Sequence, residues 1–330
     1  MCAGYSREEA SVTKIWPGVG LLIGATLTYA QTYPVKPVRV ITPFTAGSAI
    51  DTLARVVGQK LGDTWGQQVV IDNRIGANGI IGTEAAAKAP PDGYTVYLGN
   101  ISTLAVNPHL YLKLPYDALR DFAPVTLAAT IPVVLVVHPS LPVKSVRELI
   151  ALAKAHPGQL NYASGGTGSA QHLPMEMLRV ETGINIVHVP YKGLGPAFSD
   201  VLGGQVPMMF TGVSNVVPYM KTGRLRVLAI GSPRRSATLP DVPTVAEAGV
   251  PGFDFDSWTG YLVPVGTPRE LIVKLHADIT RTLVAPEVRD KLVTLGFDLV
   301  GGTPEAFATL IRNDIARFGK LIKAAGIKAE

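Results

Sequence analysis

The feature that most constrains the fold is an alternation of β-branched apolar runs with segments of helical periodicity, which begins near Pro37. In the first unit, residues 38–44 are apolar, residues 45–48 interrupt the run, and apolar side chains then recur at helical spacing from Ile50 to Leu61. Strands that alternate with helices in this way are typical of an α/β fold with parallel strands. Two further strands, at 68–72 and 95–100, and an Ala-rich helix at 80–89 continue the pattern.

The same rhythm restarts in the second half of the chain, without a sequence repeat. A chain of 330 residues exceeds the usual size of one domain, so we expect two lobes. Strands are predicted in the second lobe at 160–164, 186–191, 206–210 and 226–230, with helices from about Ala170 and Pro196.

Two apolar passages connect the predicted lobes. Residues 125–138 are too long for one ordinary strand and contain Pro132, so we interpret them as a crossover into the second lobe, and residues 258–264 form the return. Two such crossover strands make a hinge suited to opening and closing around a ligand. Helices are then predicted from about Pro268, Pro286 and Pro304. The predicted boundaries are 1–30 for a signal peptide, 31–129 plus 262–330 for lobe 1, and 130–261 for lobe 2.

The N-terminal segment has the pattern of an export signal. Arg7 and Lys14 precede an apolar run at 15–29, and Thr28-Tyr29-Ala30 fits a small-residue cleavage site. Because the run of about 15 residues is shorter than the roughly 20 that span a bilayer, a permanent anchor is the weaker alternative. We expect a cleaved signal peptide and a location in the periplasm. Glu8 and Glu9 suit a leader poorly, which leaves a start near Val12 open.

Composition and charge exclude several classes of protein. Hydrophobic residues make up 47% and charged residues 17% of the chain, which favours a compact globule over a disordered chain. The net charge of +5 comes from scattered Lys and Arg without interleaved aromatics, so no nucleic-acid partner is expected. The only cysteine, Cys2, lies in the predicted leader. Disulfides, thiolate catalysis and Cys-based zinc sites are therefore excluded from the mature chain.

The sequence holds no complete catalytic or metal-binding motif. It has neither a Gly-x-Ser-x-Gly elbow nor a His-Glu-x-x-His pair, and its six histidines show no metal-ligand spacing. Lys221-Thr222-Gly223 matches one β-lactamase box, but the only Ser-x-x-Lys, Ser11 to Lys14, lies in the leader. We expect no catalytic residue, no metal and no cofactor. A hydrolase that uses His172 or the Ser169 loop is the rival hypothesis. His172 is otherwise a ligand contact or, as we favour, a helix-face histidine satisfied by hydrogen bonds.

Open α/β sheets bind ligands at the carboxyl ends of their strands, where loops lead into helix N-termini. The loop from Phe44 to Asp51 contains Thr45, Ala46, Gly47 and Ser48. Its glycine lets the backbone approach a ligand, and the N–H groups of the coming helix favour an anion. Ser48 and Asp51 also have the spacing of a capping pair, so a purely structural role is the alternative.

Loops of similar composition follow other predicted strands. The segment Ser164-Gly165-Gly166-Thr167-Gly168-Ser169 matches neither a dinucleotide fingerprint nor a P-loop, and a small anion held by neutral dipoles fits it better. Tyr191-Lys192-Gly193, Thr211-Gly212 and Ser102-Thr103 also follow strand ends. Each one alone resembles an ordinary turn, but their recurrence at comparable places indicates a binding site.

Ordered motifs along the whole chain identify a family. They are Pro43-Phe44-Thr45-Ala46-Gly47 with Asp51 and Ala54-Arg55, Asp72-Asn73-Arg74 with Gly76-Ala77, Pro91-Asp92-Gly93-Tyr94, Val189-Pro190-Tyr191-Lys192-Gly193, and Leu239-Pro240-Asp241-Val242-Pro243-Thr244. With these motifs the chain resembles the Bug receptors, the periplasmic solute-binding proteins of tripartite tricarboxylate transporters. The resemblance implies a two-lobed, type II-like periplasmic binding protein of the α/β class, without catalysis.

The resemblance also implies a ligand and the loops that hold it. A small mono- or dicarboxylate would be gripped by Phe44 to Ser48 in the first lobe, and Tyr191 to Gly193 would lie nearby in the second. The second lobe would close on the ligand with Ser164, Gly165, Gly168 and Ser169. Because the charge of Asp51 would repel a carboxylate, we expect Asp51 to fix the loop and the amides of residues 46–48 to grip the ligand.

Two positions depart from the pattern of the family. Ser48 stands where the family usually has a second glycine, and Thr211 stands where it often has Asp. An added hydroxyl and a lost negative charge predict a preference for a more anionic or more polar ligand. We expect a monomer that closes around its ligand and delivers it to membrane permease subunits. A receptor that reports ligand occupancy to a membrane sensor is the alternative.

Overall fold

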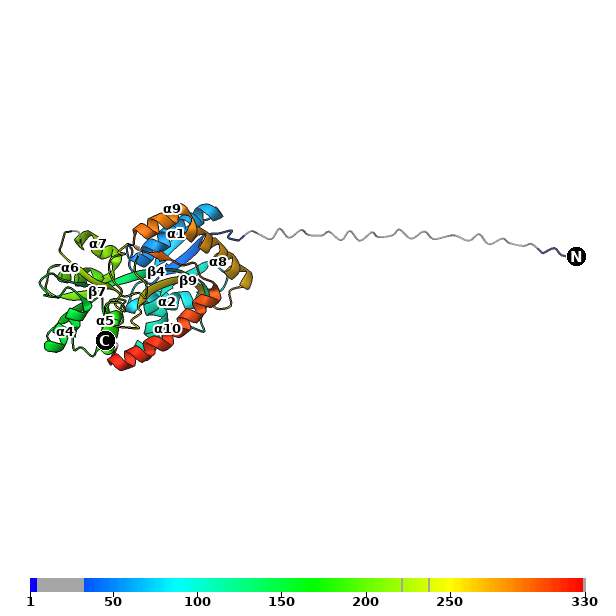
Figure 1. Ribbon diagram of the computed structural model, residues 1–330. Coiled ribbons are helices and arrows are strands. Elements are labelled where there is room, and N and C mark those ends of the chain that lie inside the picture. Colours follow the sequence, from blue (N-terminus) through cyan, green and yellow to red (C-terminus); the bar gives the residue numbers. More distant parts are fainter. Residues whose placement is uncertain (5–32, 221, 237, 329–330) are drawn as a thin grey trace. The chain divides into compact units, whose positions relative to one another are not determined.

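The computed structural model describes residues 1–4, 33–220, 222–236 and 238–328 (Figure 1). The chain divides into a unit of residues 1–32 and a unit of residues 33–330, and every element named below belongs to the second. Apart from residues 1–4, the predicted signal peptide lies outside the described residues, as does Lys221 of the β-lactamase-like box. No helix in the described ranges is long and apolar enough to cross a bilayer.

The strands of the described residues form a ten-stranded sheet in the order β2-β1-β3-β9-β4-β7-β5-β6, and β8 and β10 also pair with β4. The strands are β1 (Val38–Thr42), β2 (Val69–Asn73), β3 (Thr95–Asn100), β4 (Phe122–Val137), β5 (Asn161–Ser164), β6 (Val187–Pro190), β7 (Met208–Gly212), β8 (Arg226–Ile230), β9 (Asp256–Pro264) and β10 (Asp298–Leu299). The predicted strands are thus confirmed in order, and β3 and β8 have the predicted bounds. Short β-branched runs bounded by turn residues carry a strong local signal.

The segment around Pro132 is one long strand, although its length had argued against an ordinary one. β4 has 16 residues because it serves two half-sheets: residues 122–132 pair with β9, and residues 133–137 pair with β7. Pro132 lies where the partner changes, a place at which a missing N–H costs the ladder little. We call the half with β1, β2, β3 and β10 lobe 1 and the half with β5, β6, β7 and β8 lobe 2, and the long strands β4 and β9 run between them.

Strand direction places the strand ends at the junction of the two lobes. β1 is parallel to β2 and β3, and β5 is parallel to β6 and β7. β9 is antiparallel to β3 and β4, and β4 is antiparallel to β7. β3 therefore runs toward lobe 2, as β4 does, whereas β7 runs toward lobe 1. The carboxyl ends of both parallel sets thus face the junction, where ligands of open α/β sheets bind.

Helices cover both faces of the lobe 1 sheet (Figure 1). Side chains alternate along β3: Val96 and Leu98 face one core with α1, α8 and α9, and Tyr97 faces the other with α2 and α10. The helices are α1 (Ala49–Trp65), α2 (Ile80–Ala87), α3 (Asn107–Leu110), α4 (Val146–Ala155), α5 (His172–Thr182), α6 (Leu194–Leu202), α7 (Val213–Met220), α8 (Arg269–Val284), α9 (Pro286–Thr294) and α10 (Pro304–Ala325), with a 3-10 turn η1 (Ala77–Gly79) and a π-helix η2 (Ser102–Val106).

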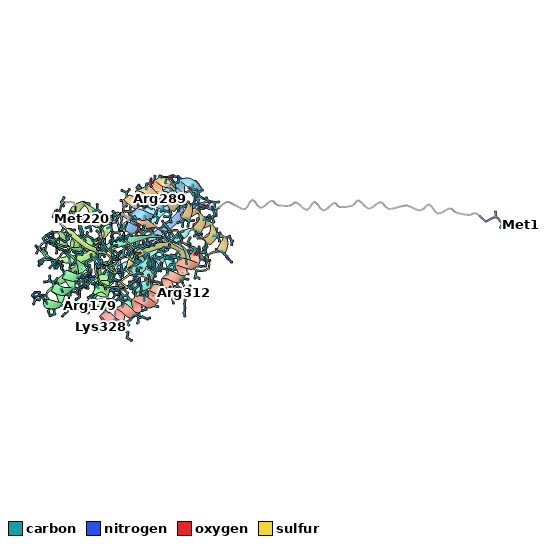
Figure 2. The ribbon with its side chains drawn as sticks, in the orientation of Figure 1. Met1, Arg179, Met220, Arg289, Arg312 and Lys328 are labelled. Carbon is teal, nitrogen blue, oxygen red and sulfur yellow. The ribbon has the colours of Figure 1, made fainter. Side chains whose placement is uncertain are left out.

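The C-terminal helix α10 packs on both lobes. Near its middle, the Asp314 carboxylate accepts a hydrogen bond from Trp258 Nε1 of β9 at 2.6 Å. At its end, the Ala325 carbonyl accepts from Arg179 Nη2 of α5 at 2.7 Å, and Figure 2 shows Arg179 beside Lys328, the last described residue. α10 therefore joins the lobes independently of β4 and β9.

Candidate functional site

The first loop at the junction leads from β1 into α1. Ser48 is the N-cap of α1, and its hydroxyl accepts a hydrogen bond from the Asp51 N–H at 3.2 Å. Asp51, which is 1% exposed, accepts in turn from the Gly47 N–H at 2.8 Å. This pairing is a capping box displaced by one residue. It fixes the loop while Gly47 adopts a φ of +81°, which favours glycine.

Asp51 is also the centre of a network that ties the loop to β2. Its carboxylate accepts from Asn73 Nδ2 and from Arg55 Nε, both at 2.9 Å. Asn73 Nδ2 also donates a hydrogen bond to the Phe44 carbonyl at 3.0 Å. Burial raises the pKa of Asp51, but hydrogen bonds from Arg55, Gly47 and Asn73 outweigh it and hold that pKa below its usual range. The ionised carboxylate is thus engaged by donors of the protein.

Two of the three amides predicted to grip the ligand are occupied by the protein itself. The Gly47 N–H donates to Asp51, and the Ser48 N–H donates to the Thr45 carbonyl at 3.1 Å. Within the described residues, the N–H groups of Ala46, Ala49 and Ile50 have no such acceptor. They lie at the N-terminus of the 17-residue helix α1, whose dipole adds partial positive charge. An anion at this end would therefore meet these amides.

Ser102 and Thr103, after β3, have different surroundings. The Thr103 hydroxyl is fully buried and bonds to Asn100 and Tyr97, its Oγ1 accepting from the Asn100 N–H at 3.2 Å and from the Tyr97 hydroxyl at 3.0 Å. Thr103 therefore stabilises the start of η2. The Ser102 hydroxyl is 3% exposed and donates to the Gly168 carbonyl of lobe 2 at 3.4 Å.

The loop after β2 also lies at the junction, although the sequence did not mark it as a site. Gly76, Ala77, Asn78 and Gly79 have φ of +124°, +47°, +50° and +84°. Ala77 and Asn78 thus hold a conformation that residues with a Cβ rarely adopt. A methyl group built on Gly79 would lie 2.6 Å from Thr103 Cγ2, so this loop packs directly on the start of η2. The two glycines around Ala77-Asn78 are the signal that could have identified it.

In lobe 2, the loops after β5 and β6 are joined to each other. The Tyr191 N–H donates to the Ser164 carbonyl at 3.0 Å, and the Gly193 N–H donates to the Gly165 carbonyl at 3.2 Å. Ser164 is fully buried, and its hydroxyl accepts from the Gly166 N–H at 3.1 Å and lies 2.6 Å from His188 Nε2. The sequence missed this Ser–His pair because the two residues belong to neighbouring strands, 24 positions apart.

His172 supports this loop from the protein interior. Its ring is 3% exposed, stacks on His188 at 4.0 Å between centroids, and accepts from the Gly168 N–H through Nδ1 at 3.1 Å. Burial, followed by the neighbouring His188 and Arg179, lowers the pKa of His172 to about 3. The imidazole is therefore neutral at pH 7, and the hydrogen-bonded interpretation favoured from the sequence fits this geometry.

The remaining predicted residues are placed as follows. The Ser169 hydroxyl accepts from the His172 N–H at 3.3 Å, and the Tyr191 hydroxyl donates to Asp200 at 2.6 Å. Lys192 is exposed. Thr211 is fully buried on β7, where it accepts from Asn215 Nδ2 at 3.1 Å. Contacts join neighbouring loops at the junction in turn: 44–51 with 76–79, 76–79 with 102–103, 102–103 with 164–169, and 164–169 with 191–193.

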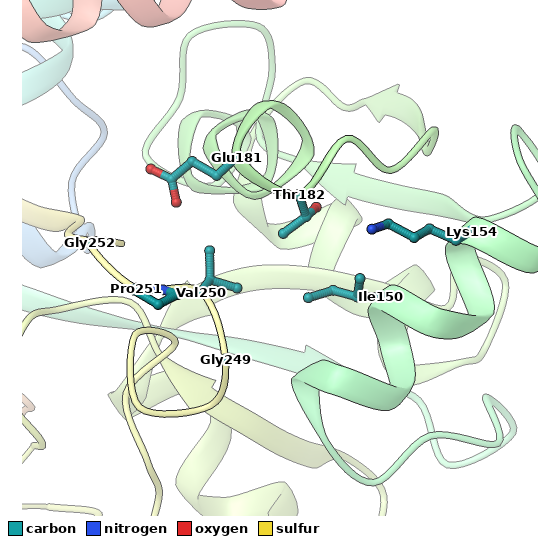
Figure 3. Close-up of a pocket in the computed structure, with 8 residues that line it drawn as sticks. All are labelled: Ile150, Lys154, Glu181, Thr182, Gly249, Val250, Pro251 and Gly252. Carbon is teal, nitrogen blue, oxygen red and sulfur yellow. The ribbon is translucent and has the colours of Figure 1, made fainter.

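A cavity of about 500 Å³ lies elsewhere, in lobe 2 (Figure 3). It opens between α4, the end of α5 and the loop at 249–252. Its lining consists of Ile150, Lys154, Glu181, Thr182, Gly249, Val250, Pro251 and Gly252. None of these residues belongs to a loop at a parallel strand end, and both charged side chains are exposed. We therefore place the candidate site at the junction. No group of three or more His, Cys, Asp or Glu within the described ranges could hold a metal ion.

Comparison with known proteins identifies the family. Residues 53–327 match the model of the tripartite tricarboxylate transporter family receptor, TctC. The chain belongs to this family. The resemblance to Bug receptors drawn from the motifs is thereby confirmed, and the chain is a solute-binding receptor of the tripartite tricarboxylate transporter type.

Solved structures of TctC relatives share the fold. The chain is similar to Rpa4515 of R. palustris, solved with adipate (37% identity, 90% of this chain and 100% of the other, TM-score 0.83). It is also similar to the periplasmic binding protein BugD (32% identity, 90% of this chain and 100% of the other, TM-score 0.79). A third similar structure is MatC of Rhodopseudomonas palustris with bound malate (34% identity, 88% of this chain and 100% of the other, TM-score 0.78). The predicted two-lobed α/β fold of periplasmic binding proteins is confirmed.

Proposed function

We propose that this TctC-family receptor captures a small mono- or dicarboxylate between its lobes and closes around it. The observation that carries the proposal is the set of unoccupied amides of Ala46, Ala49 and Ile50 at the N-terminus of α1, which follows the carboxyl end of β1 at the junction. A helix N-terminus with free N–H groups favours an anion without a counter-charge. Relatives that bind adipate and malate support a carboxylate.

The proposal extends to the setting of the receptor. Cleavage after a signal peptide at 1–30 would release it into the periplasm, where the relative BugD resides. Lobe 1, at 31–129 and 262–330, and lobe 2, at 130–261, would close about β4 and β9 as a hinge. The closed monomer would then deliver its ligand to the permease subunits of a tripartite transporter.

A non-catalytic role fits the serine–histidine pair at the junction, Ser164 and His188. Ser164 lies within hydrogen-bond distance of His188, but its hydroxyl is fully buried and already bonds to the backbone of its own loop. A nucleophile has to reach its substrate. Ser164 therefore serves to hold the loop, and the lobes bind a ligand without converting it.

The proposal is tested by replacing one unoccupied amide. Ala49 is the first residue of α1, and Ser48 before it has φ −66° and ψ 162°, a conformation that a following proline accepts. Ala49→Pro thus removes an N–H while keeping the helix start. We expect its affinity for the preferred carboxylate to fall by about 1.5–3 kcal/mol, or roughly tenfold or more, as for a hydrogen bond to a charged group.

The loss of affinity is measured by calorimetry and thermal shift with a panel of carboxylates and their neutral amides. The control Ala49→Ser keeps the N–H on an exposed position and should bind like wild type. A ligand at a hundred times its dissociation constant adds about 2.7 kcal/mol of stability to wild type. Stabilisation by no acid of the panel would overturn the carboxylate proposal. Unchanged binding by Ala49→Pro would instead remove α1 from the grip.

A further inference from the structure

Gly168 of the lobe 2 loop lies against lobe 1 too closely for any side chain. A methyl group built on it would lie 2.3 Å from Leu110 Cδ1 of α3 and 3.5 Å from Val106 Cγ1 of η2. Its φ of +76° also favours glycine. The two lobes therefore meet through the bare backbone of Gly168.

The peptide groups of Gly168 are held from both lobes. From lobe 1, the Ser102 hydroxyl donates to the Gly168 carbonyl at 3.4 Å, over 66 positions of sequence. From lobe 2, His172 Nδ1 accepts from the Gly168 N–H at 3.1 Å. Ser102 and His172 are each 3% exposed, so both bonds are shielded from water. Because a serine hydroxyl has one proton, Ser102 has none left to donate to a ligand in this state.

We propose that Ser102, Gly168 and His172 form a latch that favours lobe closure without contacting the ligand. Ser102 is then a positioning residue and not the ligand contact that the sequence predicted. The latch rests on the proposed function, because closure serves to enclose the carboxylate. A receptor whose closed state is only partly populated binds with an affinity reduced by that fraction. A latch that raises the fraction raises the affinity for every ligand by the same factor.

The test is Ser102→Ala, with Ser236→Ala as the matched control. Ser236 is a 4% exposed serine within lobe 2 whose hydroxyl accepts from the Thr238 N–H at 3.2 Å, so its loss removes a buried hydroxyl without touching the junction. Spin labels at Leu112→Cys on lobe 1 and Ser199→Cys on lobe 2, both on the protein surface, report the distance between lobes in a Cys2→Ser background. Double electron–electron resonance measures the distribution of distances between the two labels and so gives the closed-to-open ratio before ligand is added.

Loss of one hydrogen bond should lower the ligand-free closed-to-open ratio about 2- to 10-fold in Ser102→Ala and leave it unchanged in Ser236→Ala. The affinities of Ser102→Ala for adipate and for malate, used as probes, should both fall by the same factor. Gly168→Ala, with its methyl group against Leu110, should reduce the closed population further while unfolding in a single transition.

An unchanged ligand-free ratio in Ser102→Ala would overturn the latch. So would a loss of affinity for one acid and not the other, since it would make Ser102 a ligand contact. If no carboxylate binds wild type, the proposed function fails, but the ligand-free distances still decide on the latch.

Discussion

The role of Asp51 gives a prediction whose size follows from its contacts. Asp51→Asn keeps the shape of the side chain but replaces one carboxylate oxygen by an NH₂ group, which cannot accept a hydrogen bond. One oxygen of Asp51 accepts from Asn73, and the other accepts from Gly47 and Arg55. In either orientation of the new amide, its NH₂ therefore faces a donor.

The expected cost is about 1.5–3 kcal/mol of unfolding free energy at pH 7, the range for a hydrogen bond to a charged group. Arg55 adds little to this, because its side chain is 53% exposed and surface ion pairs contribute about 0–1 kcal/mol. Since the pKa of Asp51 is lowered in the folded chain, its stabilisation is present above the unfolded pKa and is lost as pH falls through the folded pKa. The difference from wild type should therefore shrink below about pH 4.

Urea unfolding at pH 7 and pH 3 measures this cost, and hydrogen exchange of the Gly47 amide reports the loop directly. Asp63→Asn, an exposed position on the same helix, is the control and should change stability by less than about 0.5 kcal/mol. Carboxylate affinity should fall with loop order. If Asp51→Asn instead binds tighter with Gly47 still protected, Asp51 acts by repelling the ligand, and the account of a fixed loop is refuted.

Two further predictions concern pH. The pKa of His172 is lowered from its ordinary value of 6.5 to about 3 in the folded chain, so its stabilisation is present above pH 6.5 and is lost as pH falls toward 3, at up to about 1.4 kcal/mol per pH unit. His172→Asn, which can still accept from Gly168, should lack this slope in urea titrations between pH 4 and 7, and parallel profiles would contradict the assignment. Burial, then Asp254 and Asp298, raises the pKa of Asp256 from 3.8 to about 6, so its contribution is full below pH 3.8 and is lost as pH rises through 6. Asp256→Asn should therefore raise the free energy of unfolding by about 1–3 kcal/mol at pH 7.5 and leave it unchanged at pH 4. An equal gain at both pH values would exclude ionisation of Asp256 as the cause.

Local signals account for the parts of the fold that the sequence predicted well. α9 and α10 begin at Pro286 and Pro304, as predicted, because proline suits the first turn of a helix and ends whatever precedes it. β4 was harder, since nothing in residues 125–138 says that one strand will pair with two half-sheets. Its length follows from its partners β9 and β7, which lie more than seventy positions further along the chain.

In the candidate site, too, the sequence predicted local features and missed those that depend on distant residues. The sequence located the loop at 44–51 and its capping pair, because Ser48 and Asp51 are three residues apart. It did not show that Asp51 takes the Gly47 amide, which depends on Asn73 and Arg55 holding the carboxylate in place. The amides of Gly47 and Ser48 are therefore occupied, and the grip that we propose rests on those of Ala46, Ala49 and Ile50.

By itself, the sequence determined the order of nine strands, seven of the helices, the glycine-rich strand ends and the family, since these depend on neighbouring residues, whereas α3, α4, α7 and β10 were not predicted. Only the tertiary structure decided which polar groups are already used. Ser102 finds Gly168 across the junction, and Ser164 finds His188 on the next strand. A donor is available to a ligand only if no protein acceptor reaches it, and that depends on residues brought together by folding.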